Sequence, residues 1–273
     1  MPELPEVETI KNELSPHIVG HQITGVTLFW EGIVRQPSAR EFCSRLIGQR
    51  LTGVARRGKY LIFSLSGGDL LIIHLKMSGS LLIGQDSSEP PKYTRAIIHL
   101  DKGTNVFFRD PRKFGLMRLV QDKNSIVGKL GPEPLEDDFT PKVLAQRLTK
   151  RQAPIKALLC DQNLIAGIGN MYADEALFAA KIHPLRSGES LSWDEIERLH
   201  VAIQQILRTA IGNKGASVAN YFRPNGTEGT AHFEFKVAHG LGGKTCPNCG
   251  TPIKRIAVRN RGTYFCHKCQ PEA

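Results

Sequence analysis

"LGPEPLEDDFTP", residues 130–141, separates two parts of this 273-residue chain that differ in character. Its prolines and its acidic run are typical of a linker, and Thr140 followed by Pro141 is typical of a helix N-cap and first turn. Short β segments precede this stretch, and helical periodicity follows it. The sequence therefore predicts an α+β protein with more than one domain.

Before the linker, residues 23–121 contain runs rich in β-branched and aromatic residues, each bounded by turn residues. The turns at Gly67-Gly68-Asp69 and Lys102-Gly103-Thr104 favour antiparallel hairpins, which can close into a sandwich or a barrel. An apolar stripe near the amino terminus (Leu4, Val7, Ile10, Leu14) predicts a first helix. The expected strands are "ITGVTLFW", "YLIFSLS", "DLLIIHLKM", "AIIHL", "NVFFRD" and "LMRLV".

After the linker, helical periodicity runs through Val143, Leu144 and Leu148 and then through "APIKALLC", "NMYADEALFAA" and "SWDEIERLHVAIQQILRTAI". Residues 213–243 are rich in Gly, Asn and Thr and are expected to form a long loop, and a cysteine module ends the chain. The predicted domains are residues 1–133, 138–223 and 237–271.

The composition, 41% hydrophobic and 23% charged, is that of an ordinary globular protein. No apolar run approaches the roughly 18 residues of a membrane span, and the start lacks the pattern of a signal peptide, so we expect a cytoplasmic protein. The net charge of +10 favours a polyanionic partner, and the lack of a basic amphipathic helix favours nucleic acid over a membrane. We expect a monomer.

Two C-x-x-C knuckles, Cys246 with Cys249 and Cys266 with Cys269, are separated by sixteen residues. Four thiolates at this spacing predict one structural Zn²⁺ with no open coordination position. Two disulfides are the alternative, which the absence of a secretion signal disfavours. The other two cysteines, Cys43 and Cys160, lie in apolar surroundings and are expected to be buried, unreactive thiols.

Between Lys244 and Cys269 there are six basic residues and no acidic one, a concentration of charge that suits phosphate contact. Arg259 and Arg261 are expected in the turn of a β hairpin, where they either reach toward a duplex or form a merely solvated basic turn.

Gly167 and Gly169 break the chain between two helical stretches, and Asn170 is the expected N-cap of the second. Such a break lets a backbone approach a phosphate, although similar turns join helices in many proteins.

The amino-terminal sequence "MPELPEVET" offers a nucleophile. Removal of Met1 would leave Pro2 with a free secondary amine, whose pKa of about 8 leaves a fraction unprotonated at neutral pH. The alternative reading is that Pro2 simply suits the first turn of a helix.

Six motifs, in order along nearly the whole chain, resemble those of the formamidopyrimidine-DNA glycosylases, bacterial enzymes that excise oxidised purines. They are "PELPEVET", "RRGKYL", "HLKMSG", "RDPRKFG", "AGIGNMY" and "RGTYFCHKC". The resemblance implies an amino-terminal antiparallel β-sandwich, a helix–two-turn–helix domain and a zinc finger that bind double-stranded DNA carrying oxidised bases or abasic sites.

The resemblance also implies roles for individual residues. Pro2 would attack C1′ and form a Schiff base, Glu3 would serve as acid and base, and Glu6 would be a supporting carboxylate. Lys59 and Arg261 match residues that assist the β- and δ-elimination steps, with phosphate binding as the alternative for each.

Further matches concern the duplex. Met77, Arg112 and Phe114 correspond to the residues that fill the void left by a flipped base, unless Met77 and Phe114 are plain strand core. The segment from Gly215 to Phe235 corresponds to a loop over the flipped base. The other expected DNA contacts are Arg151, Lys156, Asn170 and, where relatives often carry histidines, Tyr93.

The chain departs from the family pattern at Tyr93 and Arg95, which puts phosphate contact there in doubt, and at Cys160 and Asn163. An endonuclease VIII-like enzyme for oxidised pyrimidines is the first alternative, disfavoured by Leu4 and by the void-filling set. The second is a non-catalytic protein that binds damaged DNA, which would have no need of the Pro2–Glu3 pair.

Overall fold

The structure is a computed structural model, and it describes residues 1–238 and 241–272. Contacts within the chain divide it into two units: Met1–Lys129 with Asn213–Thr230, and Leu130–Gly212 with Ala231–Ala273. The domain boundaries expected from the sequence group the chain differently and stay predictions. Within the expected zinc-finger range 237–271, His239 and Gly240 lie outside the described residues.

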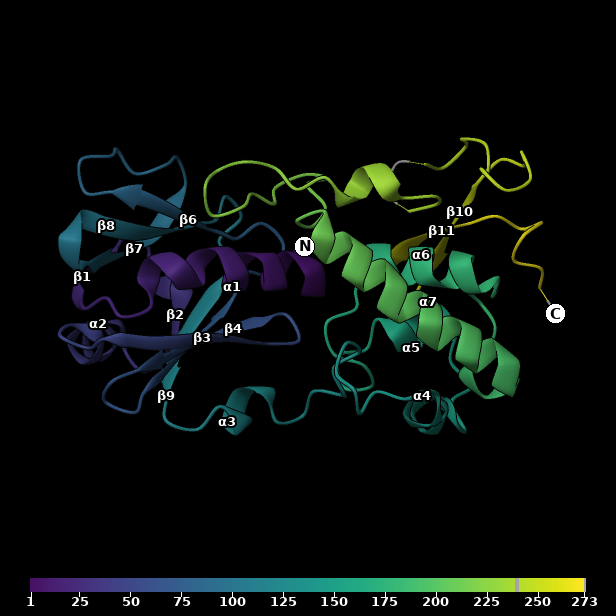
Figure 1. Cartoon of the computed structure of the whole chain (residues 1–273), viewed down its shortest axis with the longest axis horizontal. Helices are drawn as coiled ribbons and strands as arrows, with labels where there is room; N and C mark the ends of the chain where they lie inside the picture. Colours follow the sequence, from purple (N-terminus) through teal and green to yellow (C-terminus); the bar gives the residue numbers. More distant parts are fainter. Residues whose placement is uncertain (239–240, 273) are drawn as a thin grey trace. The chain divides into compact units, whose positions relative to one another are not determined.

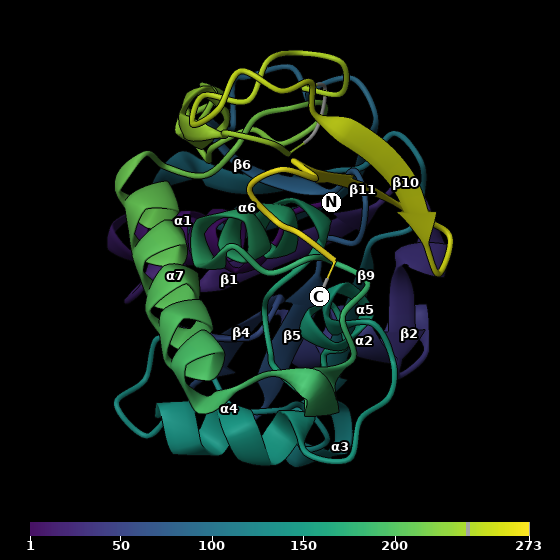
Figure 2. The ribbon, with the colours of Figure 1, turned by 90° about the vertical axis from the view of Figure 1, so that its right-hand side faces the viewer.

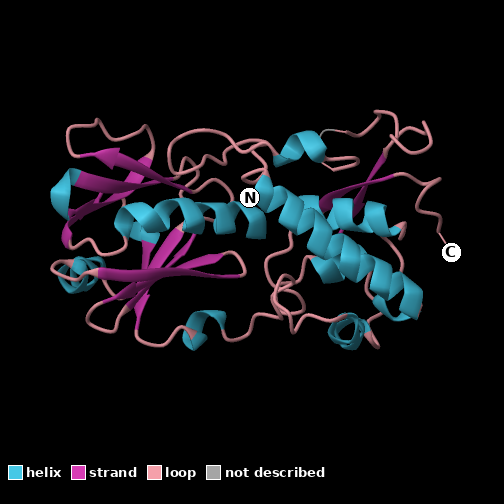
Figure 3. Ribbon diagram, viewed as in Figure 1, coloured by secondary structure: helices cyan, strands magenta, loops and turns pink. Residues whose placement is uncertain are grey.

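The first unit contains two separate sheets, so the strands form a sandwich and the barrel alternative is wrong (Figures 1 and 3). The four-stranded sheet has the order β1-β7-β8-β6 and the five-stranded sheet the order β2-β9-β5-β4-β3. The strands are β1 (Ile23–Leu28), β2 (Val34–Gln36), β3 (Leu51–Arg57), β4 (Tyr60–Leu65), β5 (Leu70–His74), β6 (Ser80–Gln85), β7 (Thr94–Leu100), β8 (Thr104–Arg109) and β9 (Leu116–Val120).

The two expected hairpins are confirmed, because β4 pairs antiparallel with β5 and β7 with β8. Strands β2, β3 and β6 were not predicted from the sequence. One pairing departs from the antiparallel expectation, since β2 runs parallel to β9, with Val34 opposite Met117. That contact joins segments about eighty residues apart, and no turn signal marks it.

Helix α1 (Leu4–Ile18) carries the predicted apolar stripe, and its apolar residues are buried. Of these, Val7, Ile10, Leu14 and Ile18 join side chains from both sheets, such as Leu61 and Phe108, in one hydrophobic core. Thus the core fixes the amino terminus of the chain against the sandwich. The other helical elements of this unit are η1 (Glu31–Ile33), α2 (Ala39–Leu46), η2 (Asp101–Gly103) and α3 (Asn124–Val127).

The second unit begins helical, as predicted. Its elements are α4 (Pro141–Leu148), α5 (Ile155–Leu159), α6 (Asn170–Ala180), η3 (Gly188–Ser190), α7 (Trp193–Gly212), η4 (Ala231–Glu234), β10 (Lys254–Val258) and β11 (Arg261–Phe265). Helices α6 and α7 lie side by side (Figure 2). Thr140 is the N-cap of α4, since its side chain accepts a hydrogen bond from the Val143 backbone N–H.

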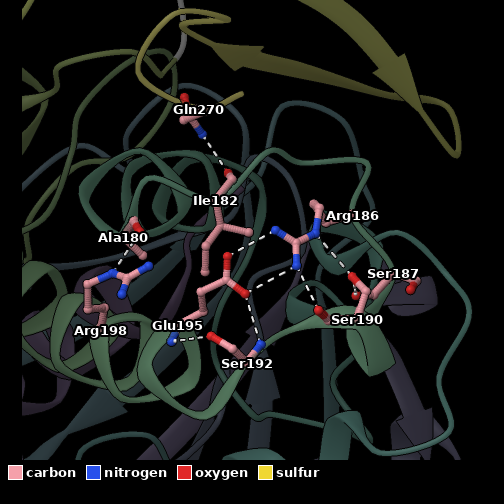
Figure 4. A network of polar contacts seen from close by, with 9 residues as sticks. All are labelled: Ala180, Ile182, Arg186, Ser187, Ser190, Ser192, Glu195, Arg198 and Gln270. Atoms are coloured by element: carbon pink, nitrogen blue, oxygen red, sulfur yellow. Dashed lines mark hydrogen bonds and ion pairs between the residues drawn. The ribbon is translucent and has the colours of Figure 1, made fainter. Parts of the chain in front are cut away.

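The start of α7 is held by a polar network (Figure 4). Ser192 and Glu195 each accept a hydrogen bond from the other's backbone N–H, at 3.3 and 2.8 Å, as in a capping box. Arg186 binds both carboxylate oxygens of Glu195, at 2.9 and 3.1 Å. The same close-up shows Gln270 donating to the Ile182 carbonyl, which ties the carboxyl-terminal knuckle to the turn after α6.

The expected linker is a packed part of the second unit rather than a free connection. The Gly131 N–H donates to the Gln162 carbonyl at 2.9 Å, and a Cβ at Gly131 would lie 2.4 Å from the Leu164 carbonyl carbon. Phe139 is buried and stacks on His200 with ring centroids 5.3 Å apart. Proline and acidic residues therefore marked a change of unit but not a flexible tether.

Part of the expected long loop, Asn213–Thr230, returns to the first unit. The Thr230 N–H donates to the Asn213 carbonyl at 2.9 Å and closes the segment at its base. The Ile83 N–H donates to the Pro224 carbonyl at 2.8 Å, and Arg223 pairs with Glu13 at 2.7 Å. Among the helices of the described residues, none has the length and apolarity to cross a membrane.

Candidate functional site

The amino terminus places Pro2 and Glu3 at the start of α1, and both are buried. Glu3 is the N-cap residue, and its backbone N–H donates to Oε2 of Glu6 at 2.7 Å. Met1 is about half exposed, so the bond that must be cut to free the Pro2 nitrogen begins at an accessible residue. The peptide that joins Pro2 to Glu3 is held in place by Glu6.

Glu6 also binds the segment Asn213–Thr230, because its Oε1 accepts a hydrogen bond from the Ala216 N–H at 2.8 Å. Gly215, next to it, has φ +77°, and a Cβ there would lie 2.9 Å from Cγ of Glu6. Burial, together with the nearby Glu6 charge, raises the pKa of Tyr221, whose hydroxyl donates to the Lys214 carbonyl at 3.0 Å. The supporting carboxylate therefore joins the helix start to this segment, a link that sequence spacing could not reveal.

Lys59 is buried at the turn between β3 and β4, directly after Gly58, which has φ +55°. The same turn is tied to α1, since Nε of Arg56 donates to a carboxylate oxygen of Glu8 at 2.7 Å. The first unit thus connects the turn carrying Lys59 to the helix that follows Pro2 and Glu3.

Met77 and Phe114 lie in turns, not in strands, and their side chains are 46% and 44% exposed. The strand-core alternative is therefore wrong for both, and β5 ends at His74, before Met77. The guanidinium carbon of Arg112 lies 4.7 Å from the centroid of the Phe114 ring. An exposed apolar pair with a cation on one ring suits contact with unstacked bases.

His74 holds the turn that carries Met77. Its Nδ1 accepts a hydrogen bond from the Lys76 N–H at 2.9 Å, and the Tyr60 ring packs against it edge-on. Burial, together with the charges of Lys76 and Lys59, lowers the pKa of His74 to about 3. The ring is therefore neutral near pH 7, as an acceptor at Nδ1 must be.

Tyr93 is exposed and is surrounded by cations. The Lys92 ammonium and the Arg95 and Arg109 guanidinium groups lie 5.1, 5.9 and 5.8 Å from its ring centroid. Arg109 also lies 5.4 Å from the ring of Phe222. This aromatic and basic surface has the character of a nucleic-acid contact, although the family's histidines are absent from it.

The four knuckle cysteines come together in the second unit, with their Sγ atoms all within 4.8 Å of one another. Two of the separations are 3.8 Å, between Cys246 and Cys269, and 3.5 Å, between Cys249 and Cys266. A tetrahedron with Zn–S bonds of about 2.3 Å requires sulfur atoms about 3.8 Å apart. The thiols therefore fit one structural Zn²⁺, and His267, which is exposed, is not needed.

The expected hairpin of the zinc module is formed by β10 and β11. Its turn residues Arg259 and Asn260 have φ of 45° and 63°, and Arg261 is the exposed first residue of β11 rather than part of the turn. The hairpin thus presents both arginines at its tip.

Helix α6 begins at Asn170, but its N-cap is Gly169, so the prediction that Asn170 caps the helix is wrong. The Asn170 Nδ2 instead donates to the carbonyl of Gly262, at 2.8 Å, next to Arg261. Its Oδ1 is buried and has no hydrogen-bond partner within the described part of the chain. Asn170, an expected DNA contact, is thereby held beside Arg261, which is expected to assist elimination or to bind phosphate.

Lys156 is fully buried, with 0% of its side chain exposed. Its ammonium lies 2.5 Å from both the Asn170 carbonyl and a carboxylate oxygen of Asp174, whose other oxygen accepts from the Tyr264 N–H at 3.2 Å. A phosphate contact by this ammonium would require it to leave that pair. Arg151, by contrast, is exposed.

Asp174 and Glu175 are adjacent carboxylates on α6 that were not predicted from the sequence as site residues. Burial raises the pKa of Asp174, although the Lys156 charge opposes the shift. Burial also raises the pKa of Glu175, whose carboxylate accepts from the backbone N–H groups of residues 236–238 at 2.7 to 3.0 Å. The signal in the sequence for these buried carboxylates was the presence of two acidic residues inside the apolar run "NMYADEALFAA".

The two remaining cysteines differ. Cys160 is buried as expected, whereas Cys43 is only partly buried. Burial raises the pKa of the Cys43 thiol, and the charge of Glu31 adds to the effect, so this thiol is weakly nucleophilic at neutral pH.

Comparison with known protein families gives three matches in chain order. Residues 1–117 match the formamidopyrimidine-DNA glycosylase N-terminal domain, and residues 130–221 match the formamidopyrimidine-DNA glycosylase H2TH domain. Residues 243–271 match the zinc finger found in FPG and IleRS. With the cysteine geometry, the last match identifies one structural Zn²⁺ site.

Similar proteins agree over the whole chain. A formamidopyrimidine-DNA glycosylase of Chloroflexus aurantiacus is 46% identical over 99% of this chain and 98% of its own length. The crystal structure of MutM (Fpg) from Thermus thermophilus has a TM-score of 0.90 and 38% identity, with both chains covered fully. A complex of the Lactococcus lactis Fpg with DNA containing an abasic site has a TM-score of 0.92 and 35% identity, covering 99% of this chain and 100% of that one.

Proposed function

The chain belongs to the formamidopyrimidine-DNA glycosylase family, and on that premise we propose that it excises oxidised purines from duplex DNA and cleaves the abasic site it creates. Excision of damaged bases is the activity of the family. The proposal concerns the lesions, which are 8-oxoguanine and formamidopyrimidines, and the lyase chemistry. We also propose that the enzyme is a monomer and that it acts on chromosomal DNA in the cytoplasm.

The reaction starts at Pro2 after removal of Met1. The amine attacks C1′ of the damaged nucleoside, the bond from C1′ to the base breaks, and Glu3 protonates the sugar oxygen as the ring opens. The observation that carries this proposal is the position of Pro2 and Glu3 at the start of α1, with the Glu3 N–H bound to Glu6. That hydrogen bond limits rotation of the peptide between the nucleophile and its acid.

The resulting iminium acidifies the C2′ protons, so loss of one of them breaks the C3′–O bond, and a second elimination breaks the C5′–O bond. Lys59 and Arg261 bind the phosphates flanking these bonds and assist departure of the leaving groups. For Arg261 the phosphate role is the better supported, because a guanidinium gives up a proton very reluctantly. Both side chains are cations, as phosphate neutralisation requires.

DNA contact involves both units. In the first unit, Met77, Arg112 and Phe114 fill the space of the flipped base, and the basic surface around Tyr93 contacts the backbone. In the second unit, Arg151, Asn170 and the hairpin tip of the zinc module contact phosphates, while the buried Lys156 supports Asn170. Zn²⁺ supplies no chemistry to the reaction, since four thiolates complete its coordination.

The family match removes the alternative of a non-catalytic DNA-binding protein. The remaining alternative, an endonuclease VIII-like preference for oxidised pyrimidines, concerns the lesion, and matched duplexes carrying 8-oxoguanine, formamidopyrimidine or an oxidised pyrimidine decide it. We expect the purine lesions to be excised faster; the opposite ranking would contradict the proposed substrate.

The catalytic assignment is tested by borohydride trapping and by Glu3→Gln. Trapping on damaged DNA should give a covalent adduct at Pro2, identified by peptide mapping. Glu3→Gln should lower 8-oxoguanine excision by about 100-fold to 10,000-fold, the range for loss of a general acid, yet still nick a duplex with a preformed abasic site.

Glu41→Gln is the matched control, because Glu41 is an exposed carboxylate on α2. Among the ion pairs of the described residues, it takes part only in the one with Arg45. It should excise at the wild-type rate. An adduct on an internal lysine, or unchanged excision in Glu3→Gln, would show that the site is misassigned even within the right family.

A further inference from the structure

The two turns that carry the void-filling residues meet over one aromatic ring. Residues 75–79 connect β5 to β6 and carry Met77, and residues 110–115 connect β8 to β9 and carry Arg112 and Phe114. A Cβ at Gly79 would lie 2.9 Å from the Phe108 ring, and a Cβ at Gly115 would lie 2.6 Å from it. Both turns therefore pack against Phe108 at positions where only glycine leaves enough room.

Asp110 binds both turns with its side chain. Its Oδ1 accepts hydrogen bonds from the Ser78 hydroxyl at 2.5 Å and from the Arg112 N–H at 3.2 Å. Its Oδ2 accepts from the Gly115 N–H at 2.7 Å. Each donor belongs to a void-filling residue or to its immediate neighbour in the chain.

The carboxylate of Asp110 is fully buried, with 0% exposure, and the three groups it binds are neutral donors. A buried carboxylate keeps its charge only where hydrogen bonds replace water, and bonds to a charged acceptor are stronger than neutral ones. The arrangement is therefore stiff, because displacement of either turn would leave part of the charge unsolvated.

The backbone of Asp110 is fixed as well. Its N–H donates to the Tyr93 carbonyl at 3.0 Å, and its carbonyl accepts from Nε of Arg95 at 2.8 Å. Arg95 also donates to the Pro111 carbonyl at 3.3 Å. Tyr93 has φ +72°, a backbone conformation that residues other than glycine rarely adopt. At the place where relatives often carry histidines, this chain uses its two residues to hold Asp110.

We propose that Asp110 is the positioning residue that joins the two turns into one rigid block, so that Met77, Arg112 and Phe114 enter the duplex together. Insertion into a base stack costs unstacking energy, and side chains already held in place lose little further entropy on insertion. This role rests on the proposed function, because it matters only for an enzyme that empties a position in a duplex. Asp110 takes no part in the bond-breaking steps.

The test separates duplex opening from chemistry with Asp110→Asn. On 8-oxoguanine in a duplex, single-turnover excision should fall by about 10-fold to 100-fold, the range for losing hydrogen bonds to a charged acceptor. On a single-stranded oligonucleotide with an abasic site there is no void to fill, so borohydride trapping should stay within about 3-fold of wild type. With 2-aminopurine next to the lesion, the fluorescence rise on unstacking should be smaller than for wild type.

Two further variants keep the test decisive. Ser78→Ala removes one hydrogen bond and should lower duplex excision by about 3-fold to 10-fold while leaving single-strand trapping unchanged. This variant tests the role even if Asp110→Asn does not fold. Asp69→Asn is the matched control, a buried carboxylate of the same unit that pairs with Arg45, and it should leave the ratio of the two activities unchanged.

Equal losses on duplex and single strand, or no loss in both Asp110→Asn and Ser78→Ala, would overturn the positioning role. A wild-type protein that leaves both purine lesions in place would instead overturn the proposed function. The two failures are therefore distinguishable.

Discussion

The turns proposed to fill the void, in the first unit, and the hairpin of the second unit are both held by buried carboxylates, but in different electrostatic ways. Asp110 accepts hydrogen bonds from a hydroxyl and two backbone N–H groups. Asp174 faces the ammonium of Lys156 at 2.5 Å, and both side chains are buried. The first arrangement contains one charge, the Asp110 carboxylate, bound by neutral donors. The second contains two opposite charges, the Asp174 carboxylate and the Lys156 ammonium, which compensate each other.

The hydrophobic support of the two regions also differs. The turns of the first unit rest on a core shared by α1 and both sheets. The core beneath the zinc module consists of Phe178, Val237, Cys246, Ile253 and Cys266, so two of its members are also zinc ligands. A module this small cannot be stabilised by apolar burial alone and needs a metal or other cross-links. Zinc, Asp174 and Glu175 supply them.

Loss of zinc should have the largest effect on stability and DNA binding, and it should affect the hairpin of the second unit but not the turns of the first. In Cys246→Ser, or after chelation, the hairpin should lose its fold, because structural zinc contributes about 10 to 16 kcal/mol in isolated fingers. Duplex affinity measured by fluorescence anisotropy should fall by more than about 10-fold, as expected when several charge-assisted contacts are lost. The unfolding transition of the first unit should be unchanged.

Cys43→Ser is the control for the zinc experiment, since Cys43 belongs to the first unit and should leave metal content and affinity unaltered. A chain that contains no zinc by metal analysis, or that binds DNA normally without it, would remove the contrast between the two regions.

Breaking the buried ion pair should have the next largest effect. Asp174→Asn leaves the Lys156 ammonium buried without its counter-charge, a change that costs about 3 to 5 kcal/mol where it has been measured. The urea midpoint of the second unit should fall accordingly. The double variant Lys156→Met with Asp174→Leu removes both charges and should recover most of the loss; equal destabilisation by single and double variants would refute an electrostatic role.

The smallest effect concerns pH and the first unit. His74 has a pKa near 3 in the folded chain and about 6.5 when unfolded, so the unfolded state binds more protons between these values. Stability should therefore be flat above pH 7 and should fall by about 1 kcal/mol between pH 6.5 and pH 5.5. Denaturant titrations at several pH values measure this slope.

His74→Asn tests whether this residue causes the slope. Asparagine retains an acceptor for the Lys76 N–H but does not titrate, so the variant should lose about 1 kcal/mol less than wild type over that interval. Identical slopes would mean that the ring is already solvated or that other groups control the pH response.

Features carried by neighbours in the chain were predictable from the sequence. The N-cap at Thr140, the two hairpins and the zinc ligands all depend on short spacings with a direct physical meaning, and each is present. Asn170 shows the limit of such reasoning. It lies at the start of α6 as expected, yet its amide binds the Gly262 carbonyl because the zinc hairpin lies beside it.

The candidate site divides in the same way. From the sequence alone came the residue types, namely the proline beside a glutamate, the lysines and arginines, the glycine turns and the four thiols, since side-chain chemistry and short spacings are local properties. Only the tertiary structure decided which of them meet. Glu6 binds Ala216, Asp110 binds Ser78, Lys156 pairs with Asp174 and β2 runs beside β9. These partners are 18 to 210 residues apart or belong to non-consecutive strands, and burial of apolar surface, which carries no pairwise signal in one sequence, is what brings them together.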